Sequence, residues 1–518
     1  MSLNALLLRP LVHRRSPITI SSLHRASNRA SNRASRSRTN PITPLIYNAF
    51  ATSASSRSSL YILPPSHNLH PSPSPPLPIS TSPTYLSYLH RLLSSLTLFL
   101  RKSLRLSRIL LTLSPVPLLV AVSHFTGNEG LKGFTVSYIT NSFESLGPCF
   151  VKLGQWMSTR RDIFGESICL GLGRLQGAGK DHGWNWTRKI IQEEWKGRNV
   201  GMVINENTEV VGSGCVAQVY KCRRDDGSYA AVKIIHPNIK SSIYLDLLVL
   251  EDFAGGFDRM PEWTGVQYFA LPEAVREFKG IMEGQIDMKK EADNLKRFRE
   301  QFKDHSKSVV FPKPDDSLTT HNILVEAYES GSPISSHFGS SSSEKKALAR
   351  PLITAFLRMV FTHSFIHCDL HPGNVLVKDD GRLVILDAGI VSELEEGDKK
   401  NLRDLFRAVV FNKGEEAGRM IVDRAKRERC EDKEMFAREI GKIVSEFHEQ
   451  RSIGLTLGAV KIGSLLSRVL DLCRTHRVLL EPAMANVVLS TIVLEGVGRT
   501  LDPDLNLFKA AMPFLVGV

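Results

Sequence analysis

Residues 367–374 read HCDLHPGN, and Asp387 follows thirteen residues after the last of them, at the start of the sequence DAG. Asp369 can accept a proton from, or orient, an attacking hydroxyl or water. The oxygens of Asn374 and Asp387 suit Mg²⁺, which proteins usually hold with one or two carboxylates together with phosphate oxygens. The stretch therefore predicts a site for a metal-bound phosphate, with a polar loop that holds no metal as the alternative.

The spacing of these residues is that of a protein-kinase catalytic loop. In that loop an Asp and an Asn lie five residues apart, and a metal-binding Asp follows further along the chain. Residues 383–386 read LVIL, which predicts a short buried strand directly before Asp387, and Gly381 predicts the turn that precedes it. The two matches together favour a kinase-like site more strongly than either does alone.

A glycine-containing segment upstream predicts a phosphate-binding loop. Residues 211–220 read VGSGCVAQVY and residues 230–233 read AAVK, and glycine lets a backbone approach phosphates closely. Lys233 ends an apolar run, where an unpaired charge is costly to bury, so it requires anions such as phosphates and a carboxylate. A surface hairpin with a solvated lysine is the alternative. The candidate nucleotide-binding residues of the loop are Gly212, Ser213, Gly214 and Cys215.

Three carboxylates qualify as the partner of Lys233. Residues 272–303 predict one long helix that carries Glu277, Glu283 and Glu291, and spacing alone does not choose among them. We take Glu291 as the candidate. The remaining pattern predicts strand, turn and strand over 210–235, a loop over 330–346, a helix over 347–365 and mainly helices over 396–515.

The formal net charge of +13 belongs to the N-terminal part of the chain. Residues 1–128 contain 14 Lys and Arg but no Asp or Glu, so 66 − 14 = 52 basic residues face 53 acidic ones in the remainder, whose net charge is about −1. Nothing in the body of the chain therefore predicts a nucleic-acid-binding face. The seven cysteines form no CxxC pair, which disfavours a zinc site, and their odd number argues against a disulfide framework.

The N-terminal part predicts targeting and membrane attachment. Residues 1–60 are rich in Arg and Ser without any acid, which is typical of a mitochondrial transit peptide; a disordered basic tail is the alternative. Residues 61–108 predict a linker that passes into a basic amphipathic segment. The apolar run over 109–125 predicts a short membrane span, although two prolines weaken it as a straight helix. An interfacial amphipathic anchor and a buried helix are the alternatives.

From about Phe143 to Pro513 the chain resembles the UbiB family, the AarF-domain atypical kinases. The family's motifs stand in order: KLGQ at 152–155, Lys233, EADN at 291–294, HCDLHPGN at 367–374, Asp387, and C-terminal signatures at 495–496 and 501–503. The chain departs from the family at residues 285–287, which read QID where ExD is usual. Its phosphate loop also reads GSGC, where the coenzyme Q branch is often rich in Ala. These departures are most similar to the branch called aarF-domain-containing kinase 2.

The resemblance implies an α+β fold with two lobes, like that of protein kinases. It implies a family-specific helical extension over 129–200, an N-lobe over 201–330 and a C-lobe over 331–518. In the family, the Lys of KxGQ meets the ExD acids near the nucleotide, so Lys152 is expected to contact Asp287, the acid that remains in QID. Gln155 completes the family-specific residues, and Glu291 is the implied ion-pair carboxylate.

The implied cofactors are ATP and Mg²⁺, with Asp369 as the catalytic residue and Asn374 and Asp387 as the metal ligands. The resemblance implies ATP hydrolysis or phosphorylation of a small molecule, tied to coenzyme Q or membrane lipids, so mitochondrial membrane lipids or quinones are the expected partners. A nucleotide-binding pseudokinase scaffold is one rival. A protein Ser/Thr kinase is another, although no Ala-Pro-Glu signature follows Asp387.

Charge also predicts an orientation at the mitochondrial inner membrane. Basic residues precede the apolar run, and the first acid, Glu129, follows it. Because positive charge tends to stay on the side from which insertion proceeds, we expect the N-terminus in the matrix and the kinase-like domain in the intermembrane space.

Overall fold

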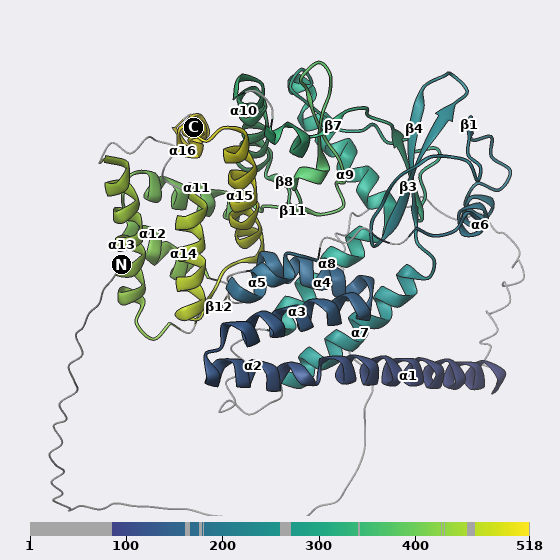
Figure 1. Ribbon diagram of the computed structural model, residues 1–518, viewed down its shortest axis with the longest axis horizontal. Helices are drawn as coiled ribbons and strands as arrows, with labels where there is room; N and C mark the ends of the chain where they lie inside the picture. The colour runs from purple at the N-terminus through teal and green to yellow at the C-terminus, as the bar shows by residue number, and fades with distance from the viewer. Residues whose placement is uncertain are drawn as a thin grey trace, which may run out of the picture. The chain divides into compact units, whose positions relative to one another are not determined.

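The computed structural model describes residues 85–516, except 161–165, 176–178, 180, 259–270, 340–341, 426, 429 and 453–461. The expected transit peptide, residues 1–60, and the first part of the expected linker lie outside the described residues. Figure 1 shows the described chain as a sheet with flanking helices that continues into a group of helices near the C-terminus.

Helices occupy the described chain ahead of the first strand. Pro115 has no backbone N–H to donate and is the first residue of the second helix. Ser114 therefore separates the first helix from the second. Gly127 ends the second helix at φ 62°, and the Asn128 side chain accepts a hydrogen bond from the Leu131 amide to begin the third. The helices are α1 (Tyr85–Leu113), α2 (Pro115–Thr126), α3 (Glu129–Leu146), α4 (Pro148–Thr159), α5 (Glu166–Leu172) and α6 (Trp184–Glu194).

An antiparallel sheet follows these helices. Strand β3 pairs with both β2 and β4, so the expected strand, turn and strand over 210–235 is in fact three strands. The strand order is β1-β3-β4-β6, with β2 also on β3. The strands are β1 (Met202–Val203), β2 (Val210–Ser213), β3 (Ala217–Arg224), β4 (Tyr229–Ile235) and β6 (Ile323–Ala327).

The helices beside this sheet correct one prediction. Residues 272–303 do not form one helix but two, α8 (Leu271–Gln285) and α9 (Met288–Gln301), which follow α7 (Ile239–Asp258). The break lies at the QID sequence, where Asp287 leaves the helical conformation and its carboxylate accepts a hydrogen bond from the Lys289 amide. An Asp at this position favours a new helix start over continuation because it satisfies a free backbone donor.

The second lobe begins with short strands around the HCDLHPGN loop. Strands β5 (Val309–Val310), β10 (Leu383–Ile385), β9 (Val375–Val377) and β7 (Ser332–Pro333) form one sheet in that order. Strand β8 (Phe365–His367) pairs with β11 (Val391–Glu393). The strand predicted over 383–386 is confirmed by β10. The loop predicted over 330–346 is only partly correct, because it contains β7, a 3₁₀ turn at Ile334–Gly339 and the start of α10 (Ser342–Arg358).

Helix α10 passes directly into a π-helical turn at Met359–His363, which ends at Ser364 with φ 53°. The helix predicted over 347–365 is therefore correct in type, but it starts earlier. Other short 3₁₀ turns lie at Lys303–His305 and Pro372–Asn374. One hydrophobic cluster runs through this region and includes Phe298 of α9, Phe356 of α10, Leu383 of β10 and Leu494 of α15. This shared core fixes the helix that carries Glu291 against the strand that precedes Asp387.

The chain after β11 is mainly helical, as predicted. The elements are α11 (Glu396–Val410), α12 (Gly414–Asp423), β12 (Arg427–Glu428), α13 (Lys433–Ser452), α14 (Ile462–Thr475), β13 (Val478–Leu479), α15 (Pro482–Leu501) and α16 (Leu507–Val516). The buried Glu495 of α15 accepts hydrogen bonds from the amides of Ile462 and Gly463 at the first turn of α14. Part of the C-terminal signature thus caps a neighbouring helix.

Two apolar segments of the described chain are long enough to cross a membrane by length and composition. One is the run Tyr88–Ser123 across α1 and α2, and the other is α15, Pro482–Leu501; in an apolar 18-residue window of each, 11% and 61% of the residues are buried. Burial marks α15 as a core helix. The first run begins well ahead of the 109–125 segment expected from the sequence, and its N-terminal part carries exposed side chains such as Leu93, Leu96 and Phe99.

Candidate nucleotide and metal site

Lys233 joins the two lobes through acidic side chains. Its Nζ donates to both carboxylate oxygens of Glu291 at 2.9 Å and lies 3.5 Å from Oδ2 of Asp387. Glu291 is 4% exposed and Lys233 is 19% exposed. The structure therefore brings together the strand lysine, the helix carboxylate and the Asp of DAG. Of the three carboxylates that spacing left open, Glu291 is the one that pairs with Lys233, while Glu277 pairs with Arg160.

Electrostatic coupling in this cluster shifts the pKa of each group. Burial opposes the charge on Lys233, but Asp387 and Glu291 outweigh it and raise the pKa of the ammonium group. Burial also opposes the Asp387 charge, yet Lys233 and Lys152 hold the pKa of that carboxyl well below its usual range. Burial, with Asp387 adding to it, raises the pKa of Glu291 despite Lys233. Asp387 is thus the acid kept most firmly ionised, which suits a ligand of Mg²⁺.

The HCDLHPGN loop is held by hydrogen bonds from its own side chains. His367 is fully buried; its Nδ1 accepts from the Asp369 amide at 3.2 Å, so its Nε2 donates to the Leu386 carbonyl at 3.0 Å. Burial lowers the pKa of His367, in agreement with this neutral form. The Asn374 amide nitrogen donates to the Asp369 carbonyl at 2.9 Å, which leaves its amide oxygen as the group that can meet a metal. The Asp369 side chain is 34% exposed and is accessible to a substrate.

Asp387 has an unusual backbone. Its φ is 51°, in the left-handed region that non-glycine residues seldom occupy outside special sites. The Gly389 amide donates to its carboxylate at 3.2 Å, and the Ala388 carbonyl accepts from Asn294 of α9 at 2.8 Å. A Cβ at Gly389 would lie 3.0 Å from the same carboxylate. Residues of α9 therefore hold the DAG segment in a conformation that presents Asp387 beside Lys233.

The glycine-containing turn between β2 and β3 is covered by the segment that precedes α6. The Gly179 amide donates to the Ser213 carbonyl at 3.0 Å, and a Cβ at Gly179 would lie 1.8 Å from the Gly214 oxygen. Only glycine fits at this crossing. The Ser213 hydroxyl is buried without a hydrogen-bond partner in the described chain, so it remains available to an anionic oxygen. Cys215 completes this turn and is partly buried.

A chain of hydrogen bonds through two histidines also holds the turn between β2 and β3, and the sequence did not predict it. The His236 Nε2 donates to the Gly214 carbonyl at 2.8 Å, so its Nδ1 accepts from the Nδ1 of His182 at 2.7 Å. His182 Nε2 then accepts from Thr187 at 2.9 Å, which accepts from Tyr220 at 2.7 Å. Two histidines so far apart in the sequence carry no local pattern that would reveal the pair.

The contact between the two Nδ1 atoms requires His236 to be neutral, and the direction of the remaining bonds holds when His182 is neutral too. Burial, together with His236, lowers the pKa of His182 to about 4, and Asp181 opposes the shift. Since the unfolded chain has a His pKa of about 6.5, it takes up the proton first as the pH falls, and the folded protein loses stability between about pH 6.5 and 4. We expect His182→Gln to flatten this part of the melting-temperature profile. A variant profile parallel to that of the wild type between about pH 4 and 6.5 would contradict the assignment.

The family-specific residues are only partly placed as expected. Gln155 on α4 donates to the Leu175 carbonyl at 2.5 Å, and so holds the helices of the extension together. Asp287 does not meet Lys152: its carboxylate caps α9 and accepts from His321 Nδ1 at 2.8 Å. The expected contact between Lys152 and Asp287 is therefore wrong, because the helix break turns Asp287 toward the start of α9.

Lys152 acts on other acids instead. It makes no hydrogen bond or ion pair with any residue that the structure describes, yet its charge helps to lower the pKa of Asp387 and opposes the rise in the pKa of Glu291. Gln285, the first residue of QID, is buried beside Gly389, and its side-chain oxygen has no partner in the described chain. Lys152 is thus a cation near Asp387 with no fixed partner among the described residues, as suits a group that contacts phosphates.

A further acid near Lys233 was not found from the sequence. Glu326 ends a buried stretch of β6 and lies opposite Ala231 of β4. Burial, followed by the nearby Glu291 carboxylate, raises the pKa of Glu326 to about 8. The only sequence signal was an acid inside the apolar run 323–327. With this pKa Glu326 is largely protonated near pH 7, and a cation bound nearby would favour its ionised form.

The donor set fits Mg²⁺ rather than a metal held by protein alone. The described residues contain no group of three or more His, Cys, Asp or Glu side chains placed to hold a metal ion. Mg²⁺ needs fewer protein ligands, because waters and phosphate oxygens complete its shell. Asp387 and the amide oxygen of Asn374 fit that chemistry.

A strand lysine paired with a helix carboxylate, a loop with Asp and Asn, and an Asp after the next strand define an atypical kinase-like site. Residues 180–420 match the ABC1 atypical kinase-like domain, and residues 448–506 match the UbiB helical domain. The chain belongs to the ABC1/UbiB family of atypical kinase-like proteins.

The relatives are mitochondrial in two cases and named as a kinase in a third. Mitochondrial ABC1 family proteins of Saccharomyces cerevisiae and Schizosaccharomyces pombe are 30% and 31% identical, over 73% and 76% of this chain and 67% and 68% of their own lengths. A Dictyostelium discoideum protein named as a serine/threonine-protein kinase is 30% identical over 75% of this chain and 65% of its own length. The chain thus spans about two thirds of each relative.

A solved structure is also similar. It is a Mycobacterium tuberculosis protein in complex with erythromycin, with a TM-score of 0.43 and 17% identity, covering 68% of this chain and 90% of that one.

Proposed function

We propose that this protein is a mitochondrial, membrane-anchored ATPase or small-molecule kinase of the atypical type, which binds Mg·ATP and acts in coenzyme Q or membrane-lipid homeostasis. The observation that carries the proposal is the contact of Lys233 with both Glu291 and Asp387. This contact aligns a phosphate-binding lysine with a metal-binding carboxylate, and a protein that used the fold only as a scaffold would not need it.

Each residue then has a chemical role. Lys233 and the backbone of the 212–215 turn bind the phosphates, and Glu291 orients Lys233. Asp387 and Asn374 hold Mg²⁺, which neutralises phosphate charge when it is bound. Asp369 orients the attacking group and accepts its proton. Lys152 adds positive charge at the phosphates.

Two alternatives remain open to experiment. A pseudokinase scaffold would bind nucleotide without turnover, and a protein Ser/Thr kinase would transfer phosphate to a protein. The names of the yeast relatives assign no acceptor. We favour water or a small molecule as acceptor, because the segment after Asp387 leads through β11 directly into α11 without an Ala-Pro-Glu signature.

ATP turnover by the purified protein tests this proposal. We expect Mg-dependent release of phosphate, and we expect Asp369→Asn to lower it by about 10²–10⁴-fold while nucleotide affinity is retained, because only proton transfer and orientation are lost. The control is Asp379→Asn, an exposed acid in the turn between β9 and β10. Equal turnover in the wild type and Asp369→Asn would leave the scaffold as the better account.

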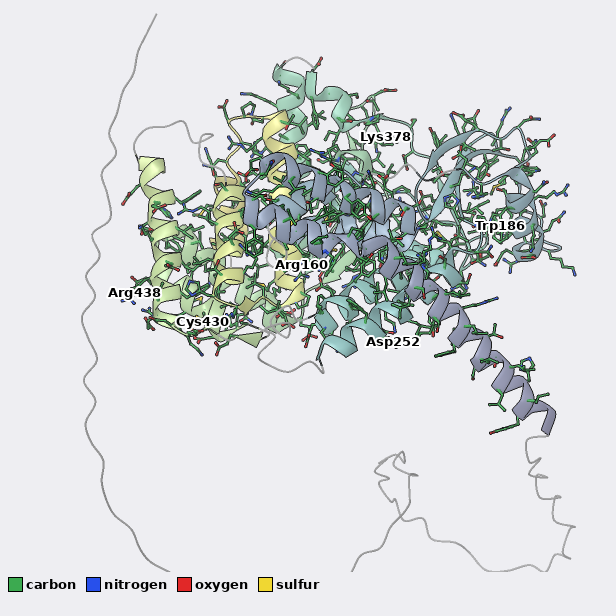
Figure 2. All side chains as sticks on the ribbon, turned by 60° about the horizontal axis from the view of Figure 1, so that its bottom comes forward. Arg160, Trp186, Asp252, Lys378, Cys430 and Arg438 are labelled. Atoms are coloured by element: carbon green, nitrogen blue, oxygen red, sulfur yellow. The ribbon has the colours of Figure 1, made fainter. Side chains whose placement is uncertain are left out.

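The anchor proposal rests on α1. Lys102 and Arg105 pair with Asp252 and Asp246 of α7, and Ile109 packs in the cluster that includes Phe143. In Figure 2 the N-terminal part of the purple helix α1 extends past the other helices. We therefore place the membrane contact on the N-terminal part of the run Tyr88–Ser123 and keep the 109–125 span as the alternative.

Membrane attachment and orientation are tested in isolated mitochondria. We expect the protein to stay with membranes after alkaline carbonate extraction, and Phe99→Glu to release part of it, because a buried charge in lipid is costly. Ser107→Glu is the control, since Ser107 is a polar, exposed position on the same helix. We expect protease to digest the domain once the outer membrane is ruptured. Protection until the inner membrane is lysed would place the domain in the matrix instead.

A further inference from the structure

A cavity of about 90 Å³ lies among helices α11, α12, α13, α14 and α15, in the group of helices coloured green to yellow in Figure 1. Its walls are mainly aliphatic and aromatic side chains, among them Leu402, Phe406, Ile440 and Leu465. No residue of the nucleotide and metal site lines it. We propose that this cavity binds the apolar chain of an uncharged lipid.

The size of the cavity sets what it can hold. Protein interiors contain few voids larger than a water molecule, so a space of about 90 Å³ is not ordinary packing. An apolar cavity of about 150 Å³ in an engineered protein stays dry and holds benzene. By that comparison the present cavity of about 90 Å³ takes roughly three to four carbon atoms, which is the end of a hydrocarbon chain.

Apolar surface continues outward from the cavity. Leu405 and Val409 of α11, Leu466 of α14 and Met484 of α15 line it and are only partly buried. The rest of the lipid's hydrocarbon chain can pack against these side chains. The unbranched side chain of Met484 can adapt to different ligands.

The charges at the cavity exclude an anionic head group. Its lining includes the acids Asp398 and Glu481, and Arg424 is the one basic residue of the described lining. Arg424 already donates to the Asn401 carbonyl at 3.3 Å and to Asp404 at 3.4 Å. A carboxylate or phosphate entering here would meet two acids with no free cation to pair with it. The apolar walls and these acids therefore favour a ligand without a negative charge at this end.

The test compares 1-decanol with decanoate, using the purified full-length protein in amphipol. We expect decanol to raise the melting temperature saturably and decanoate at the same concentration to leave it unchanged. Val469→Phe should fill the cavity, raise the melting temperature without any ligand and abolish the decanol effect. Val493→Phe is the matched control, because Val493 is exposed on α15 and does not line the cavity; it should keep the decanol effect.

A second variant keeps the proposal testable if Val469→Phe does not fold. Val469→Thr preserves the shape of the side chain but adds a hydroxyl to the cavity, and it should weaken the decanol effect several-fold. The proposal is overturned if decanol gives no saturable shift, if decanoate acts as well as decanol, or if the response survives both Val469 changes. Stabilisation by Mg·ATP should be the same in all these variants, so failure here is distinct from failure of the proposed ATP chemistry.

Discussion

Asp387→Asn is expected to abolish the stabilisation of the protein by Mg·ATP while leaving the free protein folded. A ligand at one hundred times its Kd stabilises a folded protein by about 2.7 kcal/mol, and this is the effect that should vanish. Asn keeps the shape of the side chain, and it tolerates the left-handed φ of 51° at this position. It removes the charge that Lys233 and Lys152 keep ionised, which Mg²⁺ requires.

Thermal melting with and without Mg·ATP measures this effect. The free variant should stay folded but melt somewhat below the wild-type temperature, because the lowered pKa of Asp387 means that its charge stabilises the folded protein through Lys233 and Lys152. Relief of the repulsion that Asp387 exerts on Glu291 and Glu326 offsets part of this loss. Asp379→Asn, on the exposed turn before β10, should respond to Mg·ATP as the wild type does. A full Mg·ATP shift in Asp387→Asn would show that another group holds the metal.

Spacing in the sequence was enough to predict the candidate site residues that lie close together on one short segment. Asp369 and Asn374 lie on one loop, and only the two short, paired strands β9 and β10 separate that loop from Asp387, so sequence distance nearly determined their arrangement. Lys233 was predictable for a different reason: a charge inside an apolar strand must find an anion.

The contacts that depend on distant segments were not predictable. Asp287 was expected at Lys152, but its local role as a helix cap decides where its carboxylate points. The partner of Lys233 could not be chosen from spacing on one helix, because that helix is broken before Glu291. The pair of His182 and His236, and the crossing of Gly179 over Gly214, arise only when the segment before α6 packs on the sheet.

Distant contacts also limit what the sequence predicts about the membrane segment. Composition predicted that residues near 109–125 are apolar, and this is a property of the sequence alone. The neighbouring charges had been assigned to membrane orientation, yet Lys102 and Arg105 bind acids of α7 instead. A charge paired with the folded domain no longer reports on which side of a membrane it lies, so orientation has to be measured.

Glu277→Ala is expected to destabilise the protein more than the loss of any exposed ion pair. Arg160, at the end of α4, is 1% exposed, lies among the packed helices in Figure 2 and contacts Glu277 of α8 at 2.6 Å. Its guanidinium also stacks over Trp156, 5.3 Å from the ring centre. Removing one partner of a buried ion pair takes this contact from the other charge, which costs up to about 3–5 kcal/mol.

Urea unfolding followed by tryptophan fluorescence measures this loss, since Trp156 lies against Arg160. Glu434→Ala is the matched control: Glu434 pairs with Arg419 at 3.1 Å, but both side chains are about half exposed or more, and exposed pairs contribute about 0–1 kcal/mol. If Glu277→Ala costs no more than Glu434→Ala, then Arg160 has other sufficient partners. A loss of about 3–5 kcal/mol instead identifies this pair as the contact that fixes the KxGQ helix to α8. That contact sets the distance from Lys152 to the segment that carries Glu291.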